Sequence, residues 1–272
     1  MPSLLSKVTP RDVLVDPFPH VVIRDALAPD IYERLSATFP PFDWMAADQP
    51  PERRDPGSNR RFNFEVRHLL HDPRVDPAWR AFAEEHSSPA FYREFLDVFG
   101  SHLRRDYPAL ESAVGALDSL VCGVRRVTSS VEADVLLTAR AEVNTPVVAG
   151  PTSVRRVHVD LPQKLYFGLF YMRLPGDDTE GGDLELFRYR RERPTSPDFR
   201  ADDVPETLVE RVKVIPYDRN VFFLGLNGPH ALHGVSVRAS TPSFRRYVYL
   251  SAEFNRPWFD DRPSEDHQRS VL

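Results

Sequence analysis

Cysteine, glycine and long apolar runs are scarce in this sequence, and two of these scarcities exclude a class of protein. The 272 residues include 12 glycines and a single cysteine, Cys122, which rules out an internal disulfide framework and is typical of a reducing compartment. The first residues lack the apolar stretch of a signal peptide. No uninterrupted apolar run approaches the roughly 20 residues that a membrane helix needs. We therefore expect a cytoplasmic protein that neither spans a membrane nor depends on disulfides.

The chain also lacks an excess of positive charge. It has 35 lysines and arginines against 40 aspartates and glutamates, which gives a formal net charge of -5. This balance creates no basic field that would hold nucleic acid or an anionic membrane, so we expect neither as a partner. With 41% apolar residues, the composition is that of a packed globular protein.

The N-terminal part of the chain predicts a strand and two helices. Residues 17–39, PFPHVVIRDALAPDIYERLSATF, indicate a short apolar strand followed by a helix. A second helix is predicted to begin after Ser88, a suitable N-cap, with Pro89 at its first position. Its buried stripe is predicted to consist of Phe91, Phe95, Phe99 and Leu103. The segment 51–61, PERRDPGSNRR, is predicted to be a mobile loop.

From about residue 119 the pattern changes to short segments rich in valine, tyrosine, phenylalanine and leucine, most of them separated by turn residues. Eight or nine such strands favour a two-sheet jelly roll over alternating strand–helix units. We expect a mainly β fold with N-terminal helices, in which helices pack against a double-stranded β-helix core, a cupin-like jelly roll. The chain is predicted to be a single domain, 1–272, with a helical lid part at 1–118, the jelly-roll core at 119–257 and a flexible tail at 258–272.

Two distant segments indicate a metal site: RRVHVDL at 155–161 and NGPHALHGVSV at 227–237. Successive side chains on a strand alternate between faces, so His158 and Asp160 would project on the same side. An imidazole from the distant segment would complete a set of two histidines and one carboxylate, which suits iron and leaves coordination positions open. His233 is the preferred third ligand because it begins a strand. His230 falls in the preceding turn and is expected as a rim or supporting residue.

These segments and others in the same order resemble the Fe(II)/2-oxoglutarate-dependent dioxygenase superfamily, and more narrowly its prolyl-hydroxylase-like branch. The matching features are the His-x-Asp pair, a strand that ends in Tyr171 before a Pro/Asp loop, the GGDL turn at 181–184, the distal HGV at 233–235 and an Arg-Tyr pair on the last strand. The core of the resemblance covers roughly residues 130–255, and residues 16–35 also resemble the beginning of such enzymes.

The resemblance implies an enzyme, a non-haem Fe(II)/2-oxoglutarate-dependent dioxygenase, with roles for particular residues. The triad His158, Asp160 and His233 would bind Fe(II), and 2-oxoglutarate and dioxygen would be cosubstrates. An arginine on the last strand would pair with the distal carboxylate of 2-oxoglutarate. Arg245 and Arg246 must face opposite sides of that strand. Arg246 better matches the Arg-Tyr pattern and is preferred, with Arg245 as the alternative.

Three more residues receive roles from the same resemblance. Tyr171 would hydrogen-bond the carboxylate that the arginine binds, although a buried tyrosine with a satisfied hydroxyl is an equally good interpretation. Asn144, on the strand before the His-x-Asp pair, and Lys164, just after it, would contact cosubstrate or substrate. Arg60 and Arg61 suggest an anion site for a substrate, but solvated loop arginines are the preferred interpretation.

The expected reaction is hydroxylation of an unactivated C–H bond of a small molecule, a specialised metabolite or an amino-acid-like compound, with release of succinate and CO₂. Halogenation is disfavoured, because related halogenases replace the carboxylate that Asp160 keeps. One alternative is a jelly-roll metalloenzyme that does not use 2-oxoglutarate, such as a cupin-type dioxygenase or isomerase. Another is a catalytically silent binding or sensing domain of the same fold.

Overall fold

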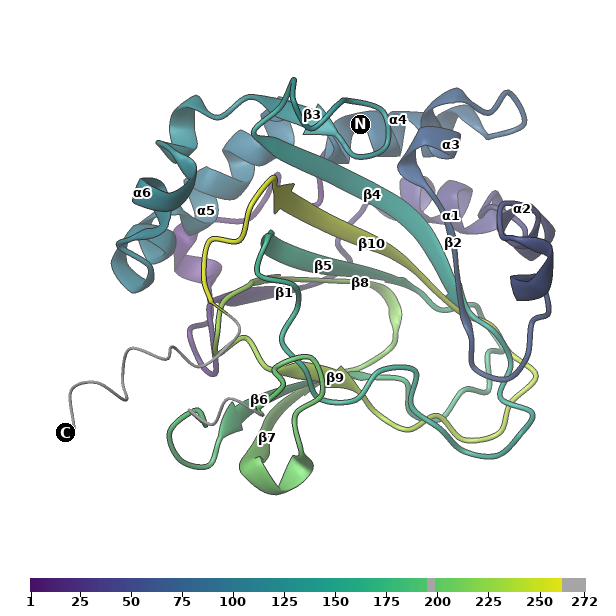
Figure 1. The fold of residues 1–272 in the computed structure, drawn as a ribbon. Coiled ribbons are helices and arrows are strands. Elements are labelled where there is room, and N and C mark those ends of the chain that lie inside the picture. Colours follow the sequence, from purple (N-terminus) through teal and green to yellow (C-terminus); the bar gives the residue numbers. More distant parts are fainter. Residues whose placement is uncertain (195–198, 261–272) are drawn as a thin grey trace.

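The computed structural model describes residues 1–194 and 199–260, and these ranges form two β-sheets with helices on one side (Figure 1). The larger sheet has seven strands; six follow the order β1-β8-β5-β10-β4-β2, and β3 pairs with β4. All its pairings are antiparallel except the parallel pairing of β3 with β4. The strands are β1 (His20–Arg24), β2 (Arg61–Phe64), β3 (Cys122–Val124), β4 (Val135–Asn144), β5 (Lys164–Met172), β8 (Arg219–Leu226) and β10 (Arg245–Phe254).

The smaller sheet has three strands in the order β7-β6-β9 and lies across from the larger one (Figure 1). Its strands are β6 (Leu184–Tyr189), β7 (Val209–Ile215) and β9 (His233–Val235). Along the chain, β8 and β10 return to the larger sheet while β9 lies in the smaller one, so the strands wind back and forth between the layers. The predicted fold class, a mainly β jelly roll packed by helices, is confirmed.

Helices cover the outer face of the larger sheet (Figure 1). They are α1 (Pro29–Ala37), α2 (Phe42–Ala47), α3 (Val66–His71), α4 (Pro77–His86), α5 (Pro89–Asp106) and α6 (Leu110–Val114), with short 3₁₀ turns at Pro10–Asp12, Pro51–Arg53, Leu117–Ser119 and Glu206–Leu208. The predicted cap of α5 is present, because Oγ of Ser88 accepts a hydrogen bond from the backbone N–H of Phe91 at 3.1 Å. Its predicted stripe is completely buried. Among the described helices, none has the length and apolarity to cross a membrane.

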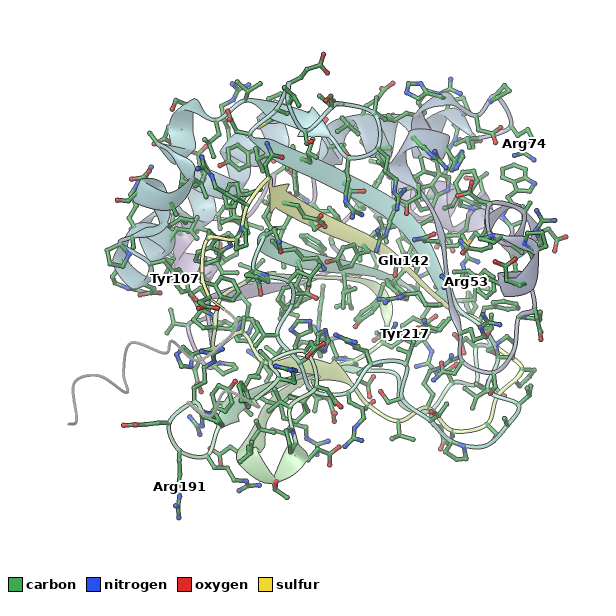
Figure 2. The ribbon with its side chains drawn as sticks, in the orientation of Figure 1. Arg53, Arg74, Tyr107, Glu142, Arg191 and Tyr217 are labelled. Carbon is green, nitrogen blue, oxygen red and sulfur yellow. The ribbon has the colours of Figure 1, made fainter. Side chains whose placement is uncertain are left out.

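The two faces of the larger sheet differ in chemistry. On β10, Val248 and Leu250 belong to the apolar core beneath the helices, whereas Tyr247 and Tyr249 belong to the core between the sheets. Because neighbouring residues on a strand face opposite ways, this alternation fixes the direction of every side chain on β10. Polar side chains that share the inner face are therefore enclosed between the two sheets, where Glu142 is labelled in Figure 2.

Three local predictions differ from the structure. Residues 153–160 do not form a regular strand; His158 makes only an isolated bridge with His233. The predicted N-terminal strand is present as β1, but β2 was not predicted, and both join the larger sheet, so a division at residue 118 would cut that sheet. Trp258, placed in the flexible tail, is buried and its Nε1 donates to the carbonyl of Lys164 at 2.7 Å. The part of the tail from residue 261 onward lies outside the described residues.

His86 in α4 gives the fold a predictable response to acid. Its ring is fully buried and stacks on the ring of Phe82, with 4.0 Å between the centroids. Nε2 accepts a hydrogen bond from the backbone N–H of Leu4 at 3.0 Å. Burial lowers its pKa from 6.5 to about 4. The unfolded chain therefore binds the proton more readily, so this part of the stability is present above pH 6.5 and is lost as the pH falls towards 4. We expect the loss to reach about 3 kcal/mol of unfolding free energy.

Urea unfolding at several pH values between 7 and 4 would measure this loss in the wild type and in His86→Gln. The glutamine keeps an acceptor for Leu4 but does not titrate, so the variant should show a shallower decline in unfolding free energy. A residual decline is expected from His20, whose pKa burial also lowers to about 4. Equal slopes in the two proteins would contradict the prediction.

Candidate active site

The side chains of His158, Asp160 and His233 come together between the two sheets. One potential ligand atom from each lies within 4.8 Å of the other two, and no other group of three or more His, Cys, Asp or Glu side chains meets this criterion in the part of the chain that the structure describes. Nε2 of His158 is 3.6 Å from Oδ1 of Asp160, and the two imidazole rings are 4.3 Å apart between centroids. Two nitrogen donors and one carboxylate are thus directed at a common point.

Backbone contacts fix both imidazoles in one orientation. Nδ1 of His158 lies 2.8 Å from the carbonyl of Arg156, and Nδ1 of His233 lies 3.0 Å from the carbonyl of Ala231. A carbonyl only accepts, so each Nδ1 carries a proton and each Nε2 is the nitrogen left to bind a metal. The ring of Phe167 stacks on His233 at 3.9 Å between centroids. The isolated bridge between the two histidine backbones replaces the expected strand and holds the rings side by side.

The charges of the triad are those that a cation requires. Burial opposes ionisation of Asp160, but the ammonium of Lys164 and the nearby imidazoles hold the pKa of that carboxyl well below its usual value. Burial, assisted by His158, lowers the pKa of His233 to about 3. The site therefore offers an ionised carboxylate and a neutral imidazole over the physiological pH range.

Lys164 and Tyr249 orient the carboxylate of Asp160. Nζ of Lys164 donates to Oδ2 of Asp160 at 3.1 Å and to the hydroxyl of Tyr249 at 2.7 Å. The Tyr249 hydroxyl in turn donates to the same Oδ2 at 3.3 Å. These contacts occupy Oδ2, so Oδ1, the oxygen that lies near Nε2 of His158, is left facing the common point. Lys164, expected to contact cosubstrate or substrate, thus holds a triad residue and also lines the cavity.

His230 does not take part in this cluster. Its side chain is exposed and packs edge-on against Tyr189, with ring centroids 5.9 Å apart. It does not line the cavity that holds the triad. Of the two histidines that the distal segment offers, His233 is therefore the one whose geometry fits a ligand.

The triad opens into a cavity of about 330 Å³ between the sheets. Its wall includes Arg245, which is only 1% exposed although it carries a full positive charge. The guanidinium donates to the Gly182 carbonyl at 2.7 Å, to Oδ1 of Asn144 at 3.0 Å and to the Tyr171 hydroxyl at 3.1 Å. All three acceptors are neutral. Among the described residues, no carboxylate lies within ion-pair distance of Arg245.

The GGDL turn makes room for this arginine. Gly182 has a φ of +77°, and a Cβ there would lie 2.9 Å from Cγ of Arg238 and 3.1 Å from Cδ of Arg245. At Gly181, with a φ of +75°, a Cβ would lie 1.9 Å from the carbonyl oxygen of Val237. Both positions thus require a left-handed backbone and the absence of a side chain. The turn places the Gly182 carbonyl oxygen 2.7 Å from Nε of Arg245, which donates a hydrogen bond to it.

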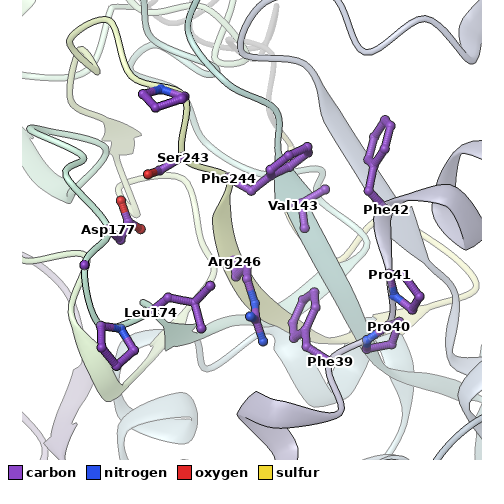
Figure 3. Close-up of a pocket in the computed structure, with 13 residues that line it drawn as sticks. Phe39, Pro40, Pro41, Phe42, Val143, Leu174, Asp177, Ser243, Phe244 and Arg246 are labelled. Carbon is purple, nitrogen blue, oxygen red and sulfur yellow. The ribbon is translucent and has the colours of Figure 1, made fainter.

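The expected orientation of Arg246 is wrong. Its side chain shares the outer face of β10 with Val248, donates to the Ser36 carbonyl at 2.6 Å and lies over the ring of Phe39 at 4.2 Å. It lines a separate cavity of about 460 Å³, where Figure 3 shows it between Leu174 and Phe39. Strand alternation allows only one of the two arginines to face the triad, and that one is Arg245.

Asn144 and Tyr171 contact Arg245 and are not part of the cavity wall. Both are completely buried, and burial raises the pKa of Tyr171 to about 12, so its hydroxyl stays protonated. Nδ2 of Asn144 is also buried and has no hydrogen-bond partner among the described residues. The two side chains orient the guanidinium rather than reaching the cavity themselves.

Sequence reasoning missed several residues of the cavity wall, among them Arg140, Glu142, Tyr247 and Tyr249. Period-two alternation could have found them. Asn144 was expected near the site, and residues two and four positions earlier on the same strand share its face. Likewise, Arg245, Tyr247 and Tyr249 occupy alternate positions of β10. Arg61 and Arg155 also line the cavity, in contrast to the preferred interpretation of the first as a solvated loop residue.

Comparisons with known proteins find similarity at the level of solved structures. No family model matches the chain, and no curated protein matches it. A prolyl-4-hydroxylase from Pseudomonas putida aligns with 13% identity and a TM-score of 0.47 over 93% of this chain and 100% of that chain. The non-heme alpha ketoglutarate dependent carbocyclase SnoK from nogalamycin biosynthesis aligns with 13% identity and a TM-score of 0.47 over 100% of this chain and 94% of that one.

A prolyl 4-hydroxylase from Phytophthora capsici aligns with 15% identity and a TM-score of 0.46 over 98% of this chain and 70% of that chain. Because the identities and TM-scores are this low, the function of the chain has to be inferred from its own site residues.

Proposed function

We propose that the protein is an Fe(II)- and 2-oxoglutarate-dependent oxygenase that hydroxylates an unactivated C–H bond of a small molecule. The observation that carries the proposal is Arg245. A buried guanidinium with neutral partners only is costly unless a carboxylate joins it. It lines the same cavity as a cluster of two histidines and one aspartate. A 2-oxo acid that binds the metal through one end would present its distal carboxylate to such a group.

The residues present fit both iron and the cosubstrate. Two imidazole nitrogens and an ionised carboxylate suit Fe(II), and three protein ligands leave positions open for other ligands. The planar fork of Arg245 suits a carboxylate, which accepts two parallel hydrogen bonds from it. Asn144 and Tyr171 would hold this fork in place. Their neutral character leaves the positive charge of the guanidinium for the incoming anion.

In the reaction, one oxygen atom of O₂ would enter the C–H bond of the substrate and the other would enter succinate, while 2-oxoglutarate loses CO₂. Iron with its cosubstrate supplies the oxygen activation. The chain itself positions the reactants. Lys164 and Tyr249 fix the carboxylate of Asp160, Phe167 covers one face of His233, and Arg245 sets the direction of the cosubstrate. The cavity volume, about 330 Å³, favours a compact substrate such as an amino-acid-like compound or a specialised metabolite.

The proposed location is the cytoplasm. The single cysteine, Cys122, supports it, because burial raises the pKa of this thiol to about 11 and a reducing compartment suits an unpaired cysteine.

An anaerobic titration of the purified protein with Fe(II) and then 2-oxoglutarate tests the proposal. We expect the weak visible charge-transfer absorption of an iron-chelated 2-oxo acid, and we expect no such absorption with Asp160→Ala. On admission of air, wild-type protein should release succinate. Binding of Fe(II) without this absorption would favour a jelly-roll enzyme that does not use 2-oxoglutarate. Absence of Fe(II) binding would favour a silent domain.

A further inference from the structure

The cavity that holds the triad carries more positive than negative charge. Among the described residues, its wall contains five basic side chains, Arg61, Arg140, Arg155, Lys164 and Arg245, and two carboxylates, Glu142 and Asp160. Iron and dianionic 2-oxoglutarate would carry opposite charges of equal size, so their binding would leave this excess unchanged. The whole chain, in contrast, has a net charge of -5. The positive excess is therefore a property of the cavity and not of the composition.

Two of the basic groups are paired with carboxylates, and a third would bind the cosubstrate. Lys164 is paired with Asp160 at 3.1 Å, and Arg140 donates to Oε1 of Glu142 at 2.6 Å. Arg245 would receive the cosubstrate. Arg61 and Arg155 remain. Within residues 1–194 and 199–260, neither of their side chains has a hydrogen bond, or an ion pair within 4.0 Å. Both are exposed, at the mouth of the cavity.

These two arginines come from opposite layers of the fold. Arg61 begins β2 and lies directly opposite Asn144, which lies directly opposite Arg245, so the three share one row across the inner face of the larger sheet. Two strand spacings, about 10 Å, separate the ends of this row. Arg155 belongs to the segment on the side of the smaller sheet, where its carbonyl accepts the N–H of Val235 at 2.9 Å.

We propose that Arg61 and Arg155 bind an oxyanion group of the substrate, a carboxylate or a phosphate. This inference rests on the proposed function, because it takes Arg245 as the site of the cosubstrate. A carboxylate at the Arg245 end of the row leaves the Arg61 end for a second ligand. The Glu142 carboxylate raises the pKa of Arg61, so Arg61 keeps its charge. Glu142 pairs with Arg140 at 2.6 Å, and no carboxylate of the described residues lies within 4.0 Å of Arg155.

Phosphate is a suitable first probe, followed by propionate and its neutral, nearly isosteric counterpart propionamide. Each would be titrated by calorimetry into the anaerobic protein loaded with Fe(II) and 2-oxoglutarate, so that Arg245 is already occupied. The variants are Arg61→Ala/Arg155→Ala and a control, Arg53→Ala/Arg60→Ala, which removes the same charge. Arg60 stacks on Phe62 and donates to the Asp55 carbonyl, and Arg53 lies on an exposed turn labelled in Figure 2; neither lines the cavity.

We expect saturable binding of phosphate or propionate to wild type and to the control, and binding about tenfold weaker in Arg61→Ala/Arg155→Ala, since two charge-assisted contacts are removed. The anion that binds with the higher affinity indicates whether the substrate group is a phosphate or a carboxylate. Propionamide should not bind. The proposal is overturned if neither anion binds wild type, if propionamide binds as well as propionate, or if both double variants lose equal affinity.

The charge-transfer absorption is recorded on the same sample before the anions are added. Its absence would mean that the proposed function fails, and the titrations would then be repeated on metal-free protein, where the two double variants still report on Arg61 and Arg155. Its presence without anion binding would leave the proposed function intact and overturn only the assignment of the two arginines.

Discussion

Replacing Arg245 by methionine is expected to weaken binding of 2-oxoglutarate to the Fe(II)-loaded protein by about 100-fold or more. Breaking a buried charge pair by removal of one partner costs about 3 to 5 kcal/mol, and every 1.4 kcal/mol corresponds to tenfold in affinity. Arg246→Met should change the affinity by less than about twofold, because that side chain lies over Phe39 on the other face of β10. Anaerobic titration of the charge-transfer absorption measures both.

Arg246→Met is a matched control for Arg245→Met, since the two arginines are neighbours on β10 and both are replaced by methionine. Arg245→Met leaves the Gly182 carbonyl, Asn144 and Tyr171 without their donor, so thermal unfolding should be recorded alongside. Arg245→Lys is the second variant: it keeps the charge but loses the planar fork, and an intermediate affinity is expected. A stable Arg245 variant with wild-type affinity, or a larger loss in Arg246→Met, would show that the cosubstrate binds elsewhere.

The mistaken preference for Arg246 shows what a motif leaves out. The Arg-Tyr pattern selects a residue by its neighbour, whereas the direction of a strand side chain is decided by which face is apolar. Arg246 shares its face with Val248 and Leu250, which pack beneath the helices. Arg245 shares its face with Tyr247 and Tyr249, whose polar ends suit an enclosed site. Reading the alternation of β10 as a whole predicts from the sequence alone which arginine faces the triad.

The order of motifs along the chain predicted the triad, whereas the argument from strand alternation does not hold. His158 and Asp160 were expected to share a face because they lie two apart on a strand, yet no regular strand forms there. What brings His158 to His233 is a two-way backbone bridge, with N···O distances of 2.9 and 3.0 Å, between segments far apart in the chain. Long-range pairing of this kind leaves no local pattern in the sequence, so the prediction depended on the order of the motifs along the chain.

Arg61 and Arg155 could not be placed from sequence. Arg61 is the last residue of a segment rich in proline, glycine and arginine, the composition of a solvated loop. It reaches the cavity only because β2 pairs with β4 at the edge of the larger sheet, which puts it opposite Asn144. That register depends on the packing of the whole sheet. Glu142, in contrast, could have been inferred from the position of Asn144 on β4.

Replacing His233 by alanine is expected to lower Fe(II) affinity by at least about 100-fold, whereas His230→Ala should leave it within about twofold of wild type. The larger figure follows because loss of a residue that merely supports a metal ligand already costs about 10–100-fold, and loss of a ligand removes a donor outright. His230 is exposed and contacts Tyr189, so it offers no donor to the triad. Anaerobic competition with a chelator of known affinity measures both.

Removal of His233 also removes the ring that stacks on Phe167, and a general loss of folding would imitate a loss of metal binding. His233→Gln therefore accompanies the alanine variant: it fills more of the space, and urea unfolding of the metal-free proteins shows whether either variant is folded. A folded His233 variant with wild-type Fe(II) affinity would contradict the assignment of the triad. Asp160 belongs to the same three-residue cluster as His158 and His233. Asp160→Ala should therefore lower the Fe(II) affinity as His233→Ala does, whereas His230→Ala should not.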